Sequence, residues 1–272
     1  MSRKNITIGG IAVVLVGIVA VAALAYAFLR PTEEASGPIE AVPLSANTPD
    51  PADTDDDDEH QADTDGEGTF VDDDDSDGAE PSDAIESEPG GSEPVLFEIV
   101  QAESEARFII DEVLRGNPKN VIGLTDQIAG EILFDAADPA SAQVGTILVN
   151  ARTLSTDDNR RNRAIGNQIL DSDNFEFISF TPTAVTGLPA SAGAGESVTF
   201  QITGDLAIRD VTNEVTFQVT VVPVSADRLE GRASTTIQRG DYGLIIPSVP
   251  FVANVGEEVL LELDFVALPV GG

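Results

Sequence analysis

The chain has 272 residues, no Cys, no Trp, a single His and a formal net charge of −34 at pH 7. Without thiols it has neither a disulfide framework nor thiolate chemistry. The surplus of acid argues against a nucleic-acid partner, because nucleic-acid phosphates are held by Lys and Arg. The acid is unevenly spread along the chain, which favours one folded domain with appendages.

The first predicted element is a membrane anchor, Ile6–Phe28, which contains no charged residue. As a helix it would span roughly 34 Å, enough to cross a hydrocarbon core of about 30 Å. Arg3 and Lys4 precede it, and the positive-inside rule then places residues 1–5 in the cytoplasm and the rest of the chain outside.

A cleavable signal peptide is the alternative to an uncleaved anchor. The runs Ala23-Leu24-Ala25 and Ala25-Tyr26-Ala27 match the pattern of small residues at cleavage sites, although the apolar stretch is longer than the usual signal core of about 7–15 residues. Both alternatives predict that the remainder is exported, and cleavage would make the protein secreted.

Residues 29–94 are predicted to form a disordered acidic linker. Within them residues 50–88 hold 19 Asp or Glu and no Lys or Arg, and such a segment cannot bury enough apolar surface to offset the entropy of ordering. Asp73–Gly78 begins like a calcium-binding loop, but Ala84 stands where the bidentate Glu would be. No metal site is therefore predicted, and loose binding of divalent cations by the acidic run is left open.

Residues 95–269 are predicted to form an all-β domain, with residues 270–272 as a tail. Short alternating stretches recur between turn signals, as in barrels and sandwiches. We predict one hairpin over Val198–Val222 and one short helix over Asp158–Leu170. The other predicted strands lie within residues 104–111, 121–124, 130–135, 144–150, 176–185, 229–237 and 255–267.

Several motifs in this domain resemble those of the YceI-like family. The run Gly204–Thr212, GDLAIRDVT, is similar to that family's signature hairpin, and Arg239–Gly243 resembles its Arg-Ser-Asp-Phe-Gly. A further block of the family's pattern is matched by Val121, Gly123, Gly130, Ile132, Phe134 and Asp135. Two polar positions depart from the pattern: Asn162 stands in place of an acid, and Glu103-Ser104 in place of His-Ser.

The resemblance implies a lipocalin-like extended antiparallel eight-stranded barrel with one short helix. It also implies that the lumen binds a polyisoprenoid or a similar long-chain amphiphilic lipid. Alternate residues of a strand face opposite sides, so the predicted lining of the lumen consists of Phe108, Ile110, Ile132, Phe134, Phe180, Phe200, Ile202, Leu206, Phe217, Val219, Val221, Val259, Leu261, Leu263 and Phe265. Arg160, Arg161 and Arg239 are the candidates for contacting the lipid headgroup.

The function predicted from the sequence is that of a membrane-tethered, extracytoplasmic lipid-binding protein. We predict no catalytic residue, metal or cofactor, because the domain lacks His and Cys and carries no nucleophile or phosphate-loop motif. The alternative is a structural or adhesive surface module whose lumen is filled by its own side chains, since a barrel of eight strands is near the size at which either outcome occurs.

Overall fold

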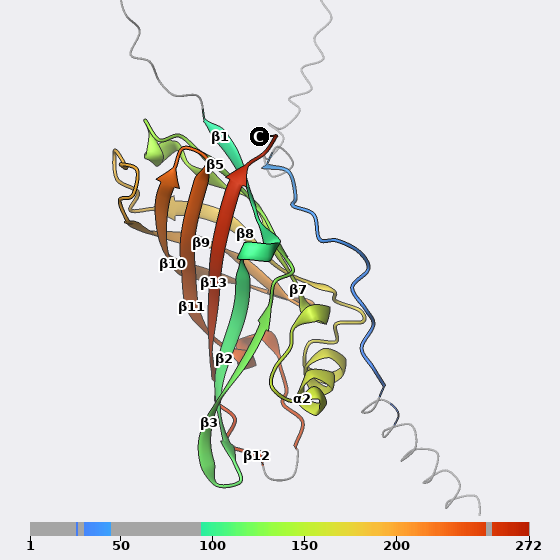
Figure 1. Cartoon of the computed structure of the whole chain (residues 1–272). Helices are drawn as coiled ribbons and strands as arrows, with labels where there is room; N and C mark the ends of the chain where they lie inside the picture. The colour runs from blue at the N-terminus through green and yellow to red at the C-terminus, as the bar shows by residue number, and fades with distance from the viewer. Residues whose placement is uncertain (1–25, 27–29, 45–93, 249–251, 272) are drawn as a thin grey trace, which may run out of the picture. The chain divides into compact units, whose positions relative to one another are not determined.

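The computed structural model of the chain describes residues 26, 30–44, 94–248 and 252–271 (Figure 1). The predicted anchor, Ile6–Phe28, lies outside these residues apart from Tyr26, and so does the acidic run 45–93. Among the residues that are described, no helix has the length and apolar character that crossing a membrane requires.

The described part of the domain is a single antiparallel sheet of thirteen strands. Their hydrogen-bonded order is β4-β7-β8-β9-β10-β11-β13-β1-β5-β6, while β2 pairs with β13, β12 and β3. The strands are β1 Val95–Ile99, β2 Glu105–Leu114, β3 Asn117–Thr125, β4 Ile128–Ala129, β5 Glu131–Phe134, β6 Gln143–Val144, β7 Ile147–Asn150, β8 Phe177–Thr186, β9 Val198–Ile208, β10 Val211–Ser225, β11 Arg228–Gln238, β12 Val252–Ala253 and β13 Glu258–Pro269.

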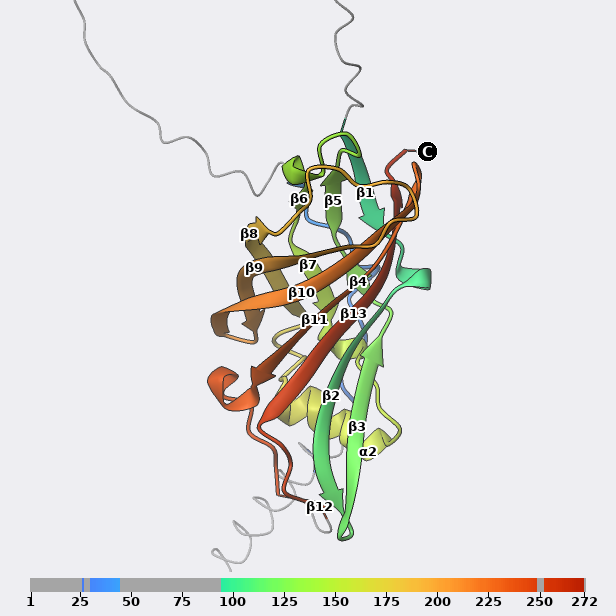
Figure 2. The same ribbon diagram turned by 90° about the vertical axis from the view of Figure 1, so that its left-hand side faces the viewer.

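The sheet curls so that the two ends of this order come together (Figure 2). β5 pairs with β6 and β4 pairs with β7, while only Gly130 separates β4 from β5 along the chain. Several of the described strands are pieces of longer ones, such as β1 and β2, which are separated by the 3-10 turn η2, Gln101–Glu103. The all-β prediction is confirmed, and the curled sheet is consistent with a lipocalin-like barrel.

The predicted hairpin is confirmed as β9 and β10, with Ile202 opposite Phe217. Its turn is shorter than the sequence suggested, because only Arg209 and Asp210 separate the strands. Arg209 adopts a φ of 58°, the left-handed conformation that tight hairpin turns require. Strand β1 was missed, and the predicted run Val144–Asn150 is broken into β6 and β7.

The predicted helix is confirmed as α2, Asn159–Ala164, which continues into the π-helical turn η5, Ile165–Ile169. Asp158 caps it, since its Oδ1 accepts hydrogen bonds from the backbone N–H groups of Arg160 at 2.7 Å and Arg161 at 3.1 Å. These bonds hold the pKa of Asp158 below its ordinary value. The helix lies near the end of the sheet that carries the β2–β3 turn (Figure 1), which we call the α2 end; the end with β5 and β6 is the β5 end.

Residues 30–44, which we call the strap, lie against the domain and correct part of the linker prediction. Ile39 is only 4% exposed, and Gln101 Nε2 donates a 2.9 Å hydrogen bond to its carbonyl. Arg152 donates to the carbonyl of Glu34 at 3.1 Å, and Ser36 donates through both its N–H and its hydroxyl to Glu176. The prediction of disorder from residue 29 onward does not hold for residues 30–44, because burial of Ile39 and polar contacts with the distant domain hold this segment.

Candidate functional site

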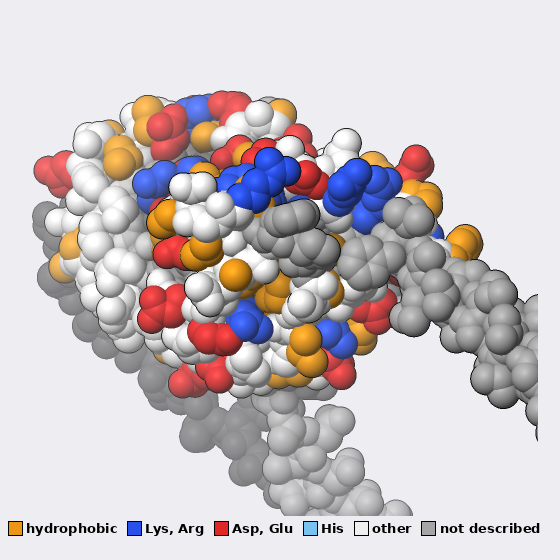
Figure 3. Space-filling view, turned by 90° about the horizontal axis from the view of Figure 1, so that it is seen from below, with side chains coloured by type: hydrophobic (Ala, Val, Ile, Leu, Met, Phe, Trp, Pro, Cys, Tyr) orange, Lys and Arg blue, Asp and Glu red, His pale blue; other side chains and the backbone are white. Residues whose placement is uncertain are grey.

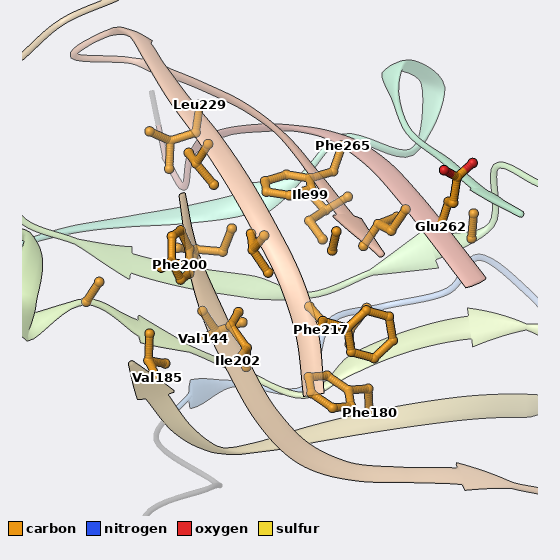
Figure 4. Close-up of a pocket in the computed structure, with 18 of the residues that line it drawn as sticks. Ile99, Val144, Phe180, Val185, Phe200, Ile202, Phe217, Leu229, Glu262 and Phe265 are labelled. Atoms are coloured by element: carbon orange, nitrogen blue, oxygen red, sulfur yellow. The ribbon is translucent and has the colours of Figure 1, made fainter. Parts of the chain in front are cut away.

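The inward face of the sheet encloses an apolar cavity of about 190 Å³. Because strand side chains alternate between faces, residues of the same parity on β9, β10 and β13 converge on it. Figure 4 shows Phe180, Phe200, Ile202 and Phe217 directed toward this space, with Glu262 at the margin of the group. The rings of Phe180 and Phe217 meet edge to face, with centroids 4.9 Å apart. We call this space the inner cavity.

A second cavity of about 630 Å³ lies between the sheet and the helix at the α2 end. Phe108, Ile110 and Val259 line it from the sheet. Ile165, Ile169 and Leu170 line it from η5 and its C-terminal end, and Leu244, Ile246 and Pro247 from the loop that follows β11. We call this space the helix cavity, because α2 and η5 form one of its walls.

The two cavities adjoin, since Leu154, Ile178 and Leu261 line both of them. The shared wall is therefore made of aliphatic side chains alone. Together the cavities form an apolar path that runs from the interior of the curled sheet to the helix, and this shape suits an elongated apolar group rather than a compact one.

Charged side chains gather where the helix cavity meets the surface. Its lining includes Arg115, Arg160 and Arg163, for which no ion pair is found within the described part of the chain. Arg115 and Arg160 are exposed, and Arg163 is half-buried. Figure 3 shows Lys and Arg groups along one side of this end, next to apolar side chains that reach the surface.

Arg161 ties the helix to the sheet. Its Nη2 lies 3.0 Å from the carboxylate of Glu112, a residue of β2 that is 6% exposed, and its Nη1 pairs with Asp157. Lys119 of β3 also pairs with Asp157 at 2.7 Å, and this hydrogen bond, with help from Arg161, holds the pKa of Asp157 below its ordinary value. The helix wall of the cavity is thus fixed by ion pairs to the β2–β3 hairpin.

Arg239 is occupied by contacts within its own loop. It donates to the carbonyls of Gly256 at 2.9 Å and Leu244 at 3.0 Å, and it pairs with Glu257. The side chain lines the helix cavity, but its donors already have partners. Of the three predicted headgroup contacts, Arg160 is therefore the one whose guanidinium is most available.

The structure brings all predicted lining residues to the wall of one cavity or the other. Leu261 borders both, Phe108, Ile110 and Val259 border the helix cavity, and the remaining eleven border the inner cavity. Arg160, Arg161 and Arg239 all border the helix cavity. That these side chains contact a lipid stays a prediction.

Sequence reasoning missed several residues of both walls. On β11 the alternation of Leu229, Ala233 and Ile237 was sufficient to predict that they face the interior, because all three share one parity. The apolar residues of η5 and the loop residues around Leu244 had no periodic signal, since a single helical turn and a loop present no repeating face. The missed lining residues include Ile99, Val144, Ile147, Val149, Leu154, Ile178, Val185, Val198, Leu229, Ala233, Arg115, Val121, Ile165, Ile169, Ile208 and Ile237.

Two bacterial proteins are similar in sequence to the β domain of this chain. A UPF0312 protein of Pseudomonas fluorescens Pf-5 is 26% identical over 172 residues, which is 60% of this chain and 84% of that relative. A UPF0312 protein of Shewanella denitrificans is 32% identical over 149 residues, covering 52% of this chain and 73% of the relative.

Among solved structures, a polyisoprenoid binding domain from Saccharophagus degradans has the same fold. It superposes with a TM-score of 0.51 at 13% identity, over 64% of this chain and 99% of that one. Residues 97–267 match the model of the YceI-like domain. The chain therefore belongs to the YceI-like family.

Proposed function

We propose that this protein is a membrane-tethered, extracytoplasmic carrier for a polyisoprenoid or a similar long-chain amphiphilic lipid. The tail occupies the inner cavity and the apolar part of the helix cavity. The headgroup lies at the α2 end, beside Arg115, Arg160 and Arg163. The similarity in fold to a polyisoprenoid binding domain supports this choice of ligand class.

The observation that carries the proposal is the pair of adjoining apolar cavities. The helix cavity, at about 630 Å³, falls in the range of roughly 300–1,000 Å³ typical of small-molecule sites. The inner cavity, at about 190 Å³, is larger than the apolar cavity of about 150 Å³ that stays dry and binds benzene in an engineered protein. A structural module with a filled lumen would offer neither space.

The energetics favour a long chain over a small molecule. Each buried CH₂ contributes about 0.8 kcal/mol, while association costs an estimated 4–15 kcal/mol in lost freedom. A tail of about 20 buried carbons therefore contributes about 16 kcal/mol, which exceeds that cost, and a short tail does not. Selectivity for the tail then follows from its length and branching, since almost all side chains that line the inner cavity are apolar.

The proposed location rests on the sequence of the N-terminal segment. The uncharged run Ile6–Phe28, preceded by Arg3 and Lys4, supports an anchor with the domain on the outer side of the membrane. Such a location suits a carrier of membrane lipids, because the lipid source and the protein share one surface.

The test is direct analysis of bound lipid. The full chain is purified from membranes in mild detergent, extracted with organic solvent and analysed by mass spectrometry. A stoichiometric long-chain lipid absent from a mock purification supports the carrier. A lipid-free chain that also fails to take up added polyprenyl phosphate points to a structural or adhesive module and refutes the proposal.

A further inference from the structure

The start of the strap is held at the α2 end of the domain. Arg30 pairs with Asp173 at 2.7 Å, and its carbonyl accepts a 2.8 Å hydrogen bond from Asn167 of η5. The backbone N–H of Glu33 donates to the same Asp173 at 2.9 Å. Thr32 lies so close to Gly166 of η5 that a Cβ on that glycine would meet its methyl group at 2.2 Å.

From this point the strap runs to the opposite end of the sheet. Ser36 contacts Glu176, just before β8, at 2.8 Å through its N–H, and the N–H of Leu44 donates to Glu131 of β5 at 2.8 Å. The acidic run 45–93 therefore leaves the domain at the β5 end and returns there at β1. It does not lie between the anchor and the domain, as a tether would.

The connection from the anchor to the strap is short. The predicted anchor ends at Phe28, two residues before Arg30, and two residues span at most about 7 Å. The N–H of Arg30 donates a 2.9 Å hydrogen bond to the carbonyl of Tyr26, the i to i+4 spacing of an α-helical turn. An anchor over Ile6–Phe28 would therefore end within two residues of Arg30, which lies at the α2 end.

The surface of the α2 end has the composition that a bilayer surface favours. Ile245 is 76% exposed, and its neighbours Leu244 and Ile246 line the helix cavity. The cations Arg115 and Arg160 border the same opening. An exposed large apolar side chain next to basic groups suits the interface of a membrane, where apolar groups reach the acyl boundary and cations meet phosphate.

We propose that the α2 end of the domain docks on the phospholipid bilayer, so that the helix cavity opens toward the membrane. This inference rests on the proposed anchor and carrier function and adds an orientation to them. Lipid then passes between the bilayer and the cavity without crossing water.

The test uses the absence of cysteine from the chain, which makes any introduced thiol unique. Ile245→Cys is labelled with a polarity-sensitive fluorophore in the full chain, reconstituted in vesicles of brominated phosphatidylcholine and phosphatidylglycerol in equal parts. The matched control is Val224→Cys, at the β5 end of β10 and 46% exposed. We expect bromine quenching and a blue shift at position 245 and neither at position 224. Equal quenching at the two positions, or stronger quenching at position 224 than at position 245, overturns the orientation.

A second pair of variants tests the role of the short connection. Twenty Gly and Ser residues inserted between Leu29 and Arg30 give the domain about 25 Å of additional reach. We expect this insertion to reduce quenching at position 245, while the same insertion between Gly66 and Glu67 leaves it unchanged. If quenching is unaffected by the first insertion and absent from vesicles without phosphatidylglycerol, surface charge alone holds the α2 end on the bilayer and the short connection has no part in its orientation.

Lipid extraction from the same samples separates this inference from the proposed function. Bound lipid without quenching at position 245 refutes the orientation and leaves the carrier intact. Quenching at position 245 in a chain that holds no lipid supports the orientation and refutes the carrier.

Discussion

Filling the inner cavity with a larger side chain should stabilise the protein and at the same time reduce lipid binding. Ala233 of β11 is buried, lies opposite Val219 and Leu263 on the neighbouring strands, and lines this cavity. In Ala233→Phe the added ring enters a space of about 190 Å³, and a cavity of about 150 Å³ already accepts benzene. The ring should therefore fit, and it would occupy the space proposed for the lipid tail.

The expected change in Tm follows from the free energy of burying the phenyl ring. Burying a phenyl side chain contributes about 1.5–3 kcal/mol, and 1 kcal/mol shifts the Tm of a domain of this size by about 2–4 °C. We expect the lipid-free chain to gain about 3–12 °C in Tm, measured by circular dichroism, while the co-purified long-chain lipid falls strongly by mass spectrometry. The control is Thr236→Phe, because Thr236 is exposed on the outer face of the same strand and should leave lipid content unchanged.

Two results would refute this reasoning. A fall in Tm would show that the ring is overpacked, a strain of about 1–3 kcal/mol, and hence that the cavity is not open in the native protein. An unchanged lipid content in a stable Ala233→Phe variant would show that the tail lies elsewhere.

Three further predictions concern the wall, the strap and the cations. Phe217→Asp places a charge in the inner cavity at a cost of several kcal/mol and should abolish folding or lipid loading, as followed by circular dichroism and lipid extraction. Burial would raise the pKa of Glu176, but hydrogen bonds from Ser36 and Asn150 and the charge of Arg152 outweigh it and lower that pKa. The stability from this contact is therefore present above the ordinary pKa of Glu and lost as the pH falls through the lowered value, so acidification and Glu176→Gln should each lower the protection factor of the Ser36 amide, which is its intrinsic exchange rate at that pH divided by the measured rate. The double substitution of Arg160 and Arg163 by Ser should preserve Tm and weaken retention of lipids with phosphate headgroups, each cation being worth about 0.2–1 kcal/mol.

Each of these predictions has a contradicting result. A Phe217→Asp chain that folds and keeps its lipid would remove this residue from the lining. A protection factor at the Ser36 amide that is independent of pH would show that Glu176 does not hold the strap. Equal retention of phosphate-bearing and neutral lipids by the Arg160 and Arg163 variant would place the headgroup away from the helix.

Much of the sheet could be predicted from the sequence because the signal is local. The period of two along β9, β10 and β13 indicates which side chains face inward. A half-buried strand has this pattern because one of its faces contacts the apolar interior and the other contacts solvent. The β9–β10 hairpin and the helix could also be predicted, because their turn residues and apolar spacing lie within short stretches of the sequence. Strand β1 was missed because Val95–Ile99 is short and carries little alternation.

Contacts between distant residues could not be predicted. The strap is held by groups such as Glu176, 140 positions away from Ser36, and nothing in the composition of residues 30–44 reports such a partner. Arg239 and Arg160 were equivalent as cations in the sequence, yet the loop that follows β11 occupies the donors of Arg239. Which of the two arginines keeps free hydrogen-bond donors depends on the backbone carbonyls that the fold places next to each side chain.

The alternating pattern by itself determined that this chain forms β-strands with one apolar face, because strand geometry links residue parity to the face that is buried. Only the tertiary structure decided that the interior of the curled sheet retains open space, since a cavity is the small difference between the volume enclosed by the strands and the summed volume of side chains from all of them. It also decided that the segment after the predicted anchor packs along the domain, because that outcome depends on hydrogen-bond partners that come together only when the sheet has curled.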